Sequence, residues 1–233
     1  MARYVAHYSW YRAGPSECAT DDGARQEFNF LLCVHHEGGW PHQDRVTDRT
    51  THESMMSDFQ GRGIDERFLR LLSRATPVKW GLFHHLRTAT YVKDRMALCG
   101  DSAHASLPWQ AAGAAQGVED ALVLCSLLSA VSDATNKQGR GGPSLEAALH
   151  AYDAVRRPRA QRQLEQAFDD HKSIFWQGEE GGDMARILAK LRGEQRFTWL
   201  WFTDMQDEVD RALSEYRRRL GEDAKVDSQR ADL

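Results

Sequence analysis

Hydrophobic and polar positions alternate with different periods along the chain, and each period predicts a type of element. The run Phe28–His35 (FNFLLCVH) is short, apolar and bounded by polar residues, which predicts a buried strand. Val78–Leu82 alternates with period two and predicts a second strand, which His84–Thr90 can extend. The segment between the first strand and the helices, Glu37–Arg49, is rich in Gly, His, Asp and Thr and is expected to be a loop.

Helical spacing dominates the rest of the chain. Thr51–Gln60 and Asp65–Ser73 are expected to be short helices, and the second repeats apolar residues at i, i+3 and i+4. The later segments expected to be helical are Ala114–Val131, Ser144–Phe175, Met184–Leu191 and Phe197–Leu220. Pro158 lies inside the longest of them and predicts a kink or an N-terminal turn. Ser132–Pro143 (SDATNKQGRGGP) is typical of a flexible linker.

Composition narrows the class of protein. With 233 residues, 41% hydrophobic and 27% charged, the chain is expected to form one large globular domain or slightly more. A net charge of −4 gives no reason to expect nucleic acid as a partner. The basic runs Arg156–Arg159 and Arg217–Arg219 lie in helical stretches rich in acidic residues and are expected to be solvated helix faces. The absence of a signal-peptide pattern, of a long apolar run and of any CxxC predicts a cytoplasmic protein without a membrane span.

The segment Gly100–Asp120 combines features that suit a ligand. Arg95–Cys99 (RMALC) is a short apolar strand that ends at Gly100, and Asp101 then presents a carboxylate that can accept hydrogen bonds from hydroxyl groups. A run of small residues, Ala111–Ala115, opens the next helix, where unpaired N–H groups and the positive end of the helix dipole favour negative charge. A ligand with an anionic ring and a simple packing joint between strand and helix both fit this pattern.

The same segment resembles the second FAD-binding motif of the flavoprotein aromatic hydroxylases, the group that contains salicylate hydroxylase and related fungal enzymes. The positions that match the motif are Gly100, Asp101, Ala103, His104, Pro108, Gly113, Gln116, Glu119, Asp120 and Ala121. Weaker similarity covers Trp80–Leu98, Trp201–Asp204, and Tyr152 with the arginines after it, so the resemblance extends from about Phe28 to Leu220.

The resemblance implies FAD as cofactor and NAD(P)H as co-substrate, with hydroxylation of a phenolic or polyketide-derived aromatic ring in secondary metabolism or aromatic catabolism. It implies that Asp101 contacts the ribityl chain and that Pro108 borders the flavin ring. The backbone around Gly100, Ala112, Gly113 and Ala114 would complete the cofactor site. Tyr11-Arg12 is similar to a Tyr-Arg pair of the family, which makes Arg12 a candidate for orienting the substrate.

The resemblance also assigns a fold class and divides the chain. We expect an α+β chain, a partial α/β FAD-binding fold with a mixed sheet fragment. The expected parts are a partial substrate-binding sheet region at 1–95, a flavin-contacting strand–loop–helix at 96–131, a linker at 132–143, a helical region at 144–220 and a disordered tail at 221–233.

Two departures from the family pattern bear on whether the chain can bind FAD and catalyse the reaction. Ala111 and Ala115 stand where the family has Gly, and their Cβ atoms are expected to crowd the flavin or to strain a turn with positive φ. No GxGxxG follows any expected strand, so the chain is expected to lack the βαβ unit that holds the ADP half of FAD. A truncated, non-catalytic remnant, or a half enzyme completed by a second chain, is therefore the main alternative function.

Two other classes of site are disfavoured. Gly100-Asp101-Ser102 is similar to the Gly-Asp-Ser of a hydrolase family, but that reaction needs a base from elsewhere in the chain, and Asp170-His171 lacks the required spacing. Ten histidines show no HExxH and no ligand spacing, so no metal site is expected, and His104 is expected to support the loop.

Overall fold

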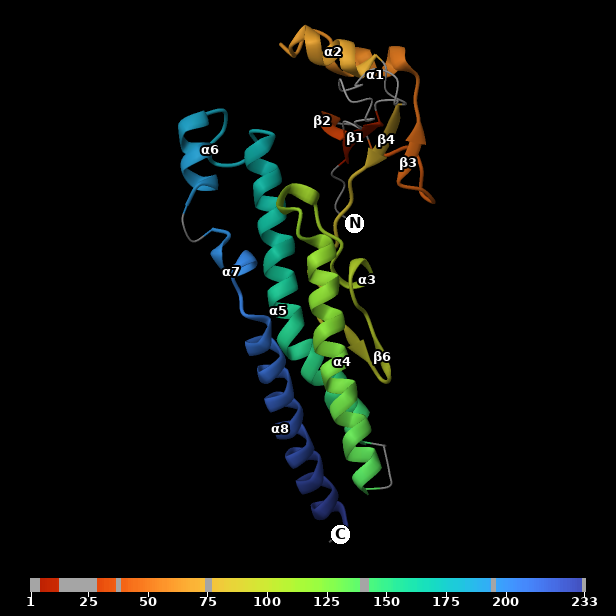
Figure 1. Ribbon diagram of the computed structural model, residues 1–233, viewed down its shortest axis with the longest axis vertical. Coiled ribbons are helices and arrows are strands. Elements are labelled where there is room, and N and C mark those ends of the chain that lie inside the picture. The colour runs from red at the N-terminus through yellow and green to blue at the C-terminus, as the bar shows by residue number, and fades with distance from the viewer. Residues whose placement is uncertain are drawn as a thin grey trace, which may run out of the picture. The chain divides into compact units, whose positions relative to one another are not determined.

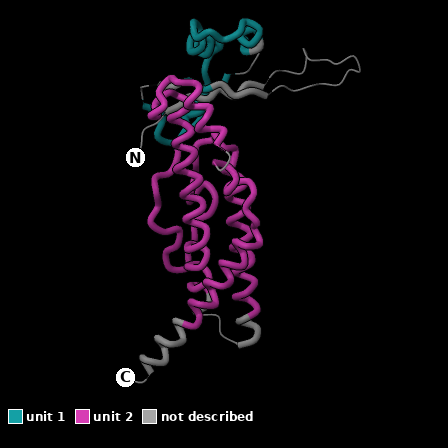
Figure 2. Tube along the Cα trace, turned by 90° about the vertical axis from the view of Figure 1, so that its left-hand side faces the viewer, with its two compact units in different colours: residues 1–83 teal, residues 84–233 magenta. Residues whose placement is uncertain are grey.

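The computed structural model describes residues 5–12, 29–36, 39–73, 77–138, 143–193 and 196–231. The chain divides into two compact units, Met1–Phe83 and His84–Leu233, shown in different colours in Figure 2. The division falls twelve residues before the boundary expected at residue 95, because His84–Thr90 does not extend the preceding strand and instead leads into the second unit.

The first unit contains an antiparallel sheet with the strand order β2-β1-β4-β3. Its strands are β1 (Val5–Arg12), β2 (Asn29–His36), β3 (Thr47–Arg49) and β4 (Val78–Gly81). Tyr8 in β1 lies opposite Cys33 in β2 and Trp80 in β4. The predicted strands β2 and β4 are confirmed, whereas β1 and the short β3 were not predicted. The β1 sequence, VAHYSWYR, is rich in aromatic residues typical of strands and alternates between apolar and polar residues over Ala6–Trp10, so the strand signal was present although the strand was not predicted.

Two short helices, α1 (His52–Phe59) and α2 (Glu66–Leu72), bury apolar residues within this unit. Thr51 caps α1, since its side-chain oxygen accepts a hydrogen bond from the Ser54 amide at 3.1 Å. Met55 and Phe59, one turn apart on α1, form a small core with Val34 and Leu72. Both helices lie where the sequence predicted them.

Three long helices form the body of the second unit: α4 (Gly113–Gln138), α5 (Pro143–Ile174) and α8 (Met205–Ala231). They lie side by side, with α4 and α8 running in one direction and α5 in the other (Figure 1). Alanines from α5 and α8 lie among larger apolar and aromatic residues in their shared core, which lets the helices approach closely. The core includes Val123 and Leu127 from α4, Ala151, Tyr152 and Ala160 from α5, and Val209, Ala212 and Tyr216 from α8.

The helix ends differ from the sequence expectation at two places. The helix α4 continues to Gln138 and α5 begins at Pro143, so most of the expected linker is helical. The backbone of α8 is helical to Ala231, where a disordered tail was expected. Both segments contain residues of low helix propensity, so the helices continue there as extensions of turns that are already packed.

Short elements join the long helices. The strands β5 (Val92–Lys93) and β6 (Met96–Ala97) form an antiparallel hairpin, and α3 (Asp101–His104) and the 3-10 turn η1 (Pro108–Gln110) lead into α4. Toward the C-terminus, α6 (Met184–Leu191) lies where it was predicted. The predicted helix Phe197–Leu220 is instead two helices, α7 (Thr198–Trp201) and α8, separated at Phe202–Asp204.

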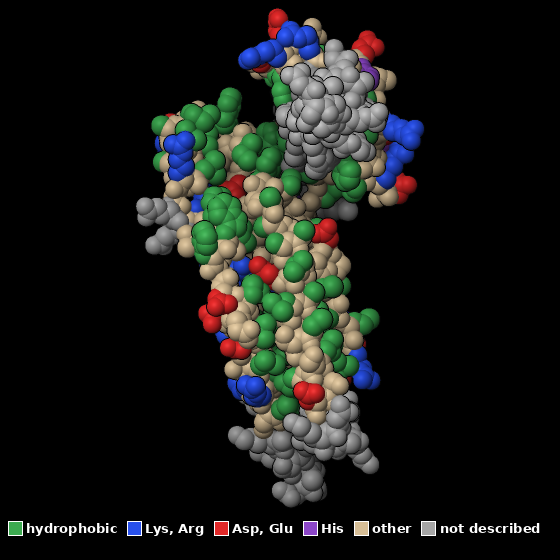
Figure 3. All heavy atoms as spheres, in the orientation of Figure 1, with side chains coloured by type: hydrophobic (Ala, Val, Ile, Leu, Met, Phe, Trp, Pro, Cys, Tyr) green, Lys and Arg blue, Asp and Glu red, His purple; other side chains and the backbone are tan. Residues whose placement is uncertain are grey.

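One side of α4 is packed and the other is apolar and exposed. Val118, Leu122 and Leu128 are solvent-exposed, and Figure 3 shows hydrophobic side chains gathered over this helix. The segment Gly113–Asp133 is long and apolar enough to cross a membrane by length and composition alone, although Glu119 and Asp120 interrupt its apolar residues. Only 22% of its apolar window is buried, and the ion-paired Glu119 and Asp120 on this helix are side chains that membrane spans rarely carry.

Candidate functional site

The candidate site begins at the turn after β6. Gly100 has φ 55°, ψ −141°, a conformation that residues with a Cβ adopt only under strain. Its backbone lies against α4, because a Cβ built on Gly117 would lie 3.5 Å from the Gly100 Cα. Asp101 follows as the first residue of α3, and its side chain is exposed. Among the described residues, none forms a hydrogen bond or ion pair with the Asp101 carboxylate.

The loop then passes through η1 into α4. Pro108 is the first residue of η1 and is exposed, and Ala111 ends the turn in the left-handed conformation with φ 50°. The expected strain is therefore confirmed at Ala111, where a Cβ costs about 1–2 kcal/mol. Ala115 lies within the helix with its side chain exposed, so the expected backbone strain does not arise there.

The start of α4 exposes backbone donors beside small side chains. The first hydrogen bond of the helix joins the Gln116 amide to the Ala112 carbonyl at 2.9 Å, so the amides of Gly113, Ala114 and Ala115 precede the helical ladder. Ala114 and Ala115 are exposed, whereas Ala112 is buried. Because α4 is 26 residues long, its dipole is fully developed at this end.

These features fit the ring and ribityl part of a flavin. Asp101 offers a carboxylate with open lone pairs, which suits the hydroxyl groups of a sugar alcohol. The amides at the start of α4 are donors suited to the carbonyl-rich, electron-accepting edge of the flavin ring, where negative charge collects on reduction. The small side chains of Ala114 and Ala115 allow a flat ring to approach the backbone.

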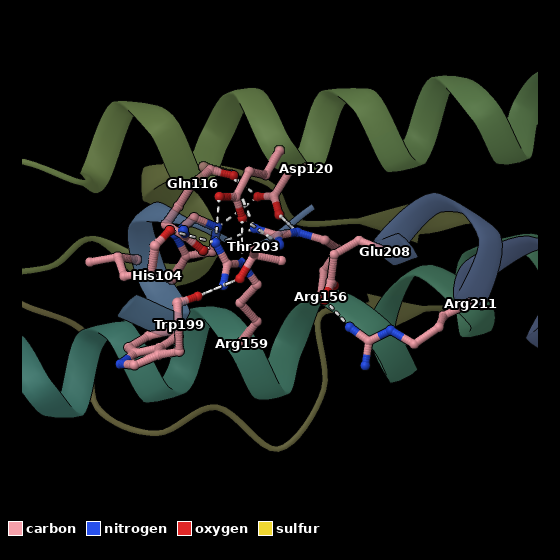
Figure 4. Close-up of polar contacts among 12 residues, drawn as sticks. His104, Gln116, Asp120, Arg156, Arg159, Trp199, Thr203, Glu208 and Arg211 are labelled. Carbon is pink, nitrogen blue, oxygen red and sulfur yellow. Dashed lines mark hydrogen bonds and ion pairs between the residues drawn. The ribbon is translucent and has the colours of Figure 1, made fainter. Parts of the chain in front are cut away.

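A buried carboxylate, Asp120, lies beneath this turn (Figure 4). One of its oxygens accepts hydrogen bonds from the Gly100 amide at 2.8 Å and from Nε2 of His104 at 2.6 Å. The other oxygen accepts from Nε of Arg156, on α5, at 2.9 Å. The side chains of Asp120 and Arg156 are both 0% exposed. The Asp120 side chain therefore connects both ends of α3 to the packed helices.

The network continues toward the C-terminal helices. Arg156 also donates to Oε2 of Glu119 at 2.7 Å and to the Gln116 side chain at 3.0 Å. Arg159 donates to both oxygens of Glu119, each at 2.8 Å. The same guanidinium reaches the carbonyl of Trp199 at 2.6 Å and that of Leu200 at 3.0 Å, both on α7. Two carboxylates and two guanidiniums thus balance in charge inside the bundle.

The electrostatics of the network favour its charged form. Burial raises the pKa of Asp120, but hydrogen bonds from His104, Gly100 and Arg156 outweigh that effect and leave the pKa below its ordinary value. Burial opposes ionisation of Glu119 as well, and the two arginines still lower its pKa. Because ionised Asp120 can only accept hydrogen bonds, Nε2 of His104 carries the proton that the two share. Burial raises the pKa of the Tyr152 hydroxyl, which donates to the Leu98 carbonyl at 2.9 Å.

A second polar cluster holds the far end of the loop. Gln110, in η1, donates to Oδ2 of Asp170 at 2.8 Å and accepts from Gln163 at 3.3 Å. Asp170 is also ion-paired with Arg196, whose Nε lies 3.0 Å from its Oδ1. Gln163 donates to Ser106 as well, at 3.1 Å. The loop from Gly100 to Gln110 is therefore tied to the helices at both ends.

The structure corrects one expectation and agrees with others. Arg156 is fully buried and Arg159 nearly so, which overturns the expected solvated face, because the apolar helix α4 carries acidic partners for both. The pair Glu119-Asp120 inside an apolar helix was the signal for these buried cations, since buried charges require partners. As expected, His104 supports the loop, and Ser102 bonds to the Cys99 backbone and not to His104.

The other candidate residues lie in different parts of the chain. Arg12 lies at the end of β1, but its side chain is outside the described residues. No group of three or more potential metal ligands comes together within the described parts of the chain. The geometry brings Gly100, Asp101, Pro108 and the Ala112–Ala114 segment onto one continuous loop and helix start.

The chain is similar in sequence to a known family and to characterised relatives. The family model described as "FAD binding domain" matches residues 41–167. The chain is 50% identical over 194 residues to an "FAD-dependent monooxygenase" from Gibberella moniliformis, covering 82% of this chain and 44% of that protein. It is 35% identical over 182 residues to a "Salicylate hydroxylase" from Pseudomonas putida, covering 78% and 39%. The chain therefore spans less than half the length of these curated relatives.

A solved structure shares the fold. The structure titled "Salicylate hydroxylase substrate complex" superposes with a TM-score of 0.69 at 24% sequence identity, covering 89% of this chain and 56% of that one. At this identity the likeness shows the fold alone, and its coverage includes residues of both units. On the family match over more than half of its residues, the chain belongs to the FAD-binding-domain family that includes the FAD-dependent monooxygenases.

Proposed function

We propose that this chain provides the flavin-facing part of an FAD-dependent monooxygenase that hydroxylates a phenolic or polyketide-derived aromatic ring. The chemistry that FAD supplies when bound is acceptance of a hydride from NAD(P)H and transfer of one oxygen atom of O2 to an electron-rich ring. The observation that carries the proposal is the open Asp101 carboxylate, which lies on the same fixed loop as the free amides at the start of α4.

The candidate site residues have separate roles in this proposal. Asp101 binds the ribityl hydroxyls, and the amides of Gly113 and Ala114 face the pyrimidine edge of the ring and stabilise its negative charge. Pro108 borders the ring where the substrate approaches, and its side chain fixes φ at that position of the turn. We assign Arg12 to orienting the substrate, through charge pairing with an acidic or phenolic ring.

The relatives support the proposed class of substrate. One is a salicylate hydroxylase and shares 35% of the aligned residues with this chain. A planar aromatic acid or phenol is therefore the first probe to use. NAD(P)H belongs to the proposal because reduction of the flavin requires a hydride donor.

The experiment measures flavin binding and oxidation together. Purified protein is titrated with FAD and followed by quenching of flavin fluorescence, and NADPH and NADH oxidation are then recorded with and without salicylate. The proposal expects saturable quenching, faster oxidation with the aromatic probe and a product heavier by one oxygen atom. Asp101→Ala should abolish the quenching, whereas Asp133→Ala, an exposed carboxylate farther along α4, should not. Wild-type protein that leaves FAD fluorescence unchanged would instead support the non-catalytic alternative.

A further inference from the structure

The Asp101 side chain has no support of its own. It is exposed, and no described residue forms a hydrogen bond or ion pair with its carboxylate, so its position depends on the backbone of the Gly100–His104 turn. That turn contains a glycine at φ 55° and a helix of only four residues, which is too short to be stable by itself. Something outside the turn must therefore hold it.

Asp120 supplies the hydrogen bonds that hold the turn from outside, beside the packing of Ala103 in the helical core. The Gly100 amide and the His104 ring, at the two ends of α3, donate to the same Asp120 oxygen at 2.8 and 2.6 Å. A single atom thus fixes the first and last residues that determine where Asp101 points. Figure 4 shows Asp120 on α4, with His104 and Arg156 turned toward it.

Arg156 makes this support rigid. Its Nε donates to the other Asp120 oxygen at 2.9 Å, and its remaining nitrogens bond to Glu119 and Gln116, so the guanidinium is held in one orientation. The side chains of Asp120 and Arg156 are 0% exposed, which removes competing water and strengthens each contact. A carboxylate placed this way can neither rotate nor exchange its partners without opening the bundle.

We propose that Asp120 and Arg156 are positioning residues that hold the Gly100–His104 turn so that the Asp101 carboxylate faces the flavin ribityl chain. This inference rests on the proposed function for the identity of the ligand, and on the described contacts alone for the turn. Neither residue touches the cofactor in this account. Their effect reaches it through the backbone of the turn and the direction of one side chain.

The test separates positioning from general stability. Asp120→Asn keeps the shape of the side chain but removes the charge and replaces one acceptor oxygen with an NH2 group, so it cannot accept from all three donors. The matched control is Leu127→Ala, two turns along the same helix, which is 1% exposed, lies in the apolar core and forms no side-chain hydrogen bond with the turn. Both variants destabilise the fold, but only the first alters the turn.

Two readouts decide the outcome. We expect Asp120→Asn to speed hydrogen exchange at the Gly100–His104 amides more than at the rest of α4, and to raise the Kd for FAD about 10-fold, as the loss of an outer support does for metal ligands. Leu127→Ala should leave the Kd unchanged at temperatures where the protein is folded. Equal exchange at the turn in both variants, or an equal Kd, would overturn the proposal.

A milder variant covers the case in which Asp120→Asn does not fold. Arg156→Lys keeps the charge but lacks the planar fork that reaches Asp120, Glu119 and Gln116 together, so the turn should loosen while the fold persists. If wild-type protein does not bind FAD, the proposed function fails, and the exchange rates at Gly100–His104 still decide whether these residues hold the turn.

Discussion

Replacing Arg156 with methionine removes the central cation of the buried network while keeping the volume of the side chain. The guanidinium contacts Asp120, Glu119 and Gln116 and is 0% exposed. Removing one partner of a buried ion pair costs about 3–5 kcal/mol, because the other charge stays buried. Glu119 keeps Arg159, and Asp120 keeps its bonds from His104 and Gly100, so we expect the lower end, about 3 kcal/mol. In a protein of this size that loss lowers the Tm by roughly 6–12 °C.

The neighbouring residue supplies a matched control. Arg157 has a side chain that is 28% exposed and pairs with Asp153, at i−4, at 3.0 Å. The same change, Arg157→Met, should cost about 1 kcal/mol, because Arg157 is partly exposed and the buried Asp153 carboxylate keeps the hydrogen bond from the Tyr91 amide at 2.7 Å. Thermal and urea unfolding of both variants against wild type give the comparison. Equal losses in the two variants, or a loss below about 1 kcal/mol for Arg156→Met, would refute the account of a buried, mutually dependent network.

Three further predictions concern pH, packing and backbone strain. The pKa values of Asp120 and Glu119 are lowered in the fold from 3.8 and 4.5, so the stability they contribute is present above those values and is lost as the pH falls through the lowered ones. The urea midpoint should therefore fall more between about pH 5 and pH 3 for wild type than for Arg156→Met. Val123→Ala should cost about 2 kcal/mol since Val123 is 0% exposed, whereas Leu122→Ala, 44% exposed, should change the unfolding free energy by less than about 0.5 kcal/mol. Ala111→Gly should raise the unfolding free energy by about 1 kcal/mol, because the residue has φ 50°, and an unchanged Tm would contradict the strain.

The sequence predicted those elements whose signals lie within a few neighbouring residues. Thr51 caps α1, and the periodic apolar residues of α2 and α6 placed both helices close to their observed bounds. The motif around Gly100 and Asp101 likewise indicated the loop and helix that form the candidate site. In each case the physical cause lies within a few residues of its effect.

The unpredicted features depend on partners far along the chain. Arg156 and Glu119 pair across 37 residues, so the burial of Arg156 follows from packing α4 against α5 and not from the charged sequence around it. The break between α7 and α8 has a similar cause. The Arg159 side chain, on α5, takes the carbonyls of Trp199 and Leu200, which a continuous helix would use for its own hydrogen bonds.

The central claim is that FAD binds at the Gly100–Ala115 loop and helix start. The most direct measurement is hydrogen exchange of the wild-type chain with and without FAD, resolved by peptide. The account predicts slower exchange at the Gly100–Ser102 and Gly113–Ala115 amides on adding FAD, and no change along Met205–Leu220 of α8. Exchange that is unchanged at both segments, or slowed only elsewhere in the chain, would contradict it.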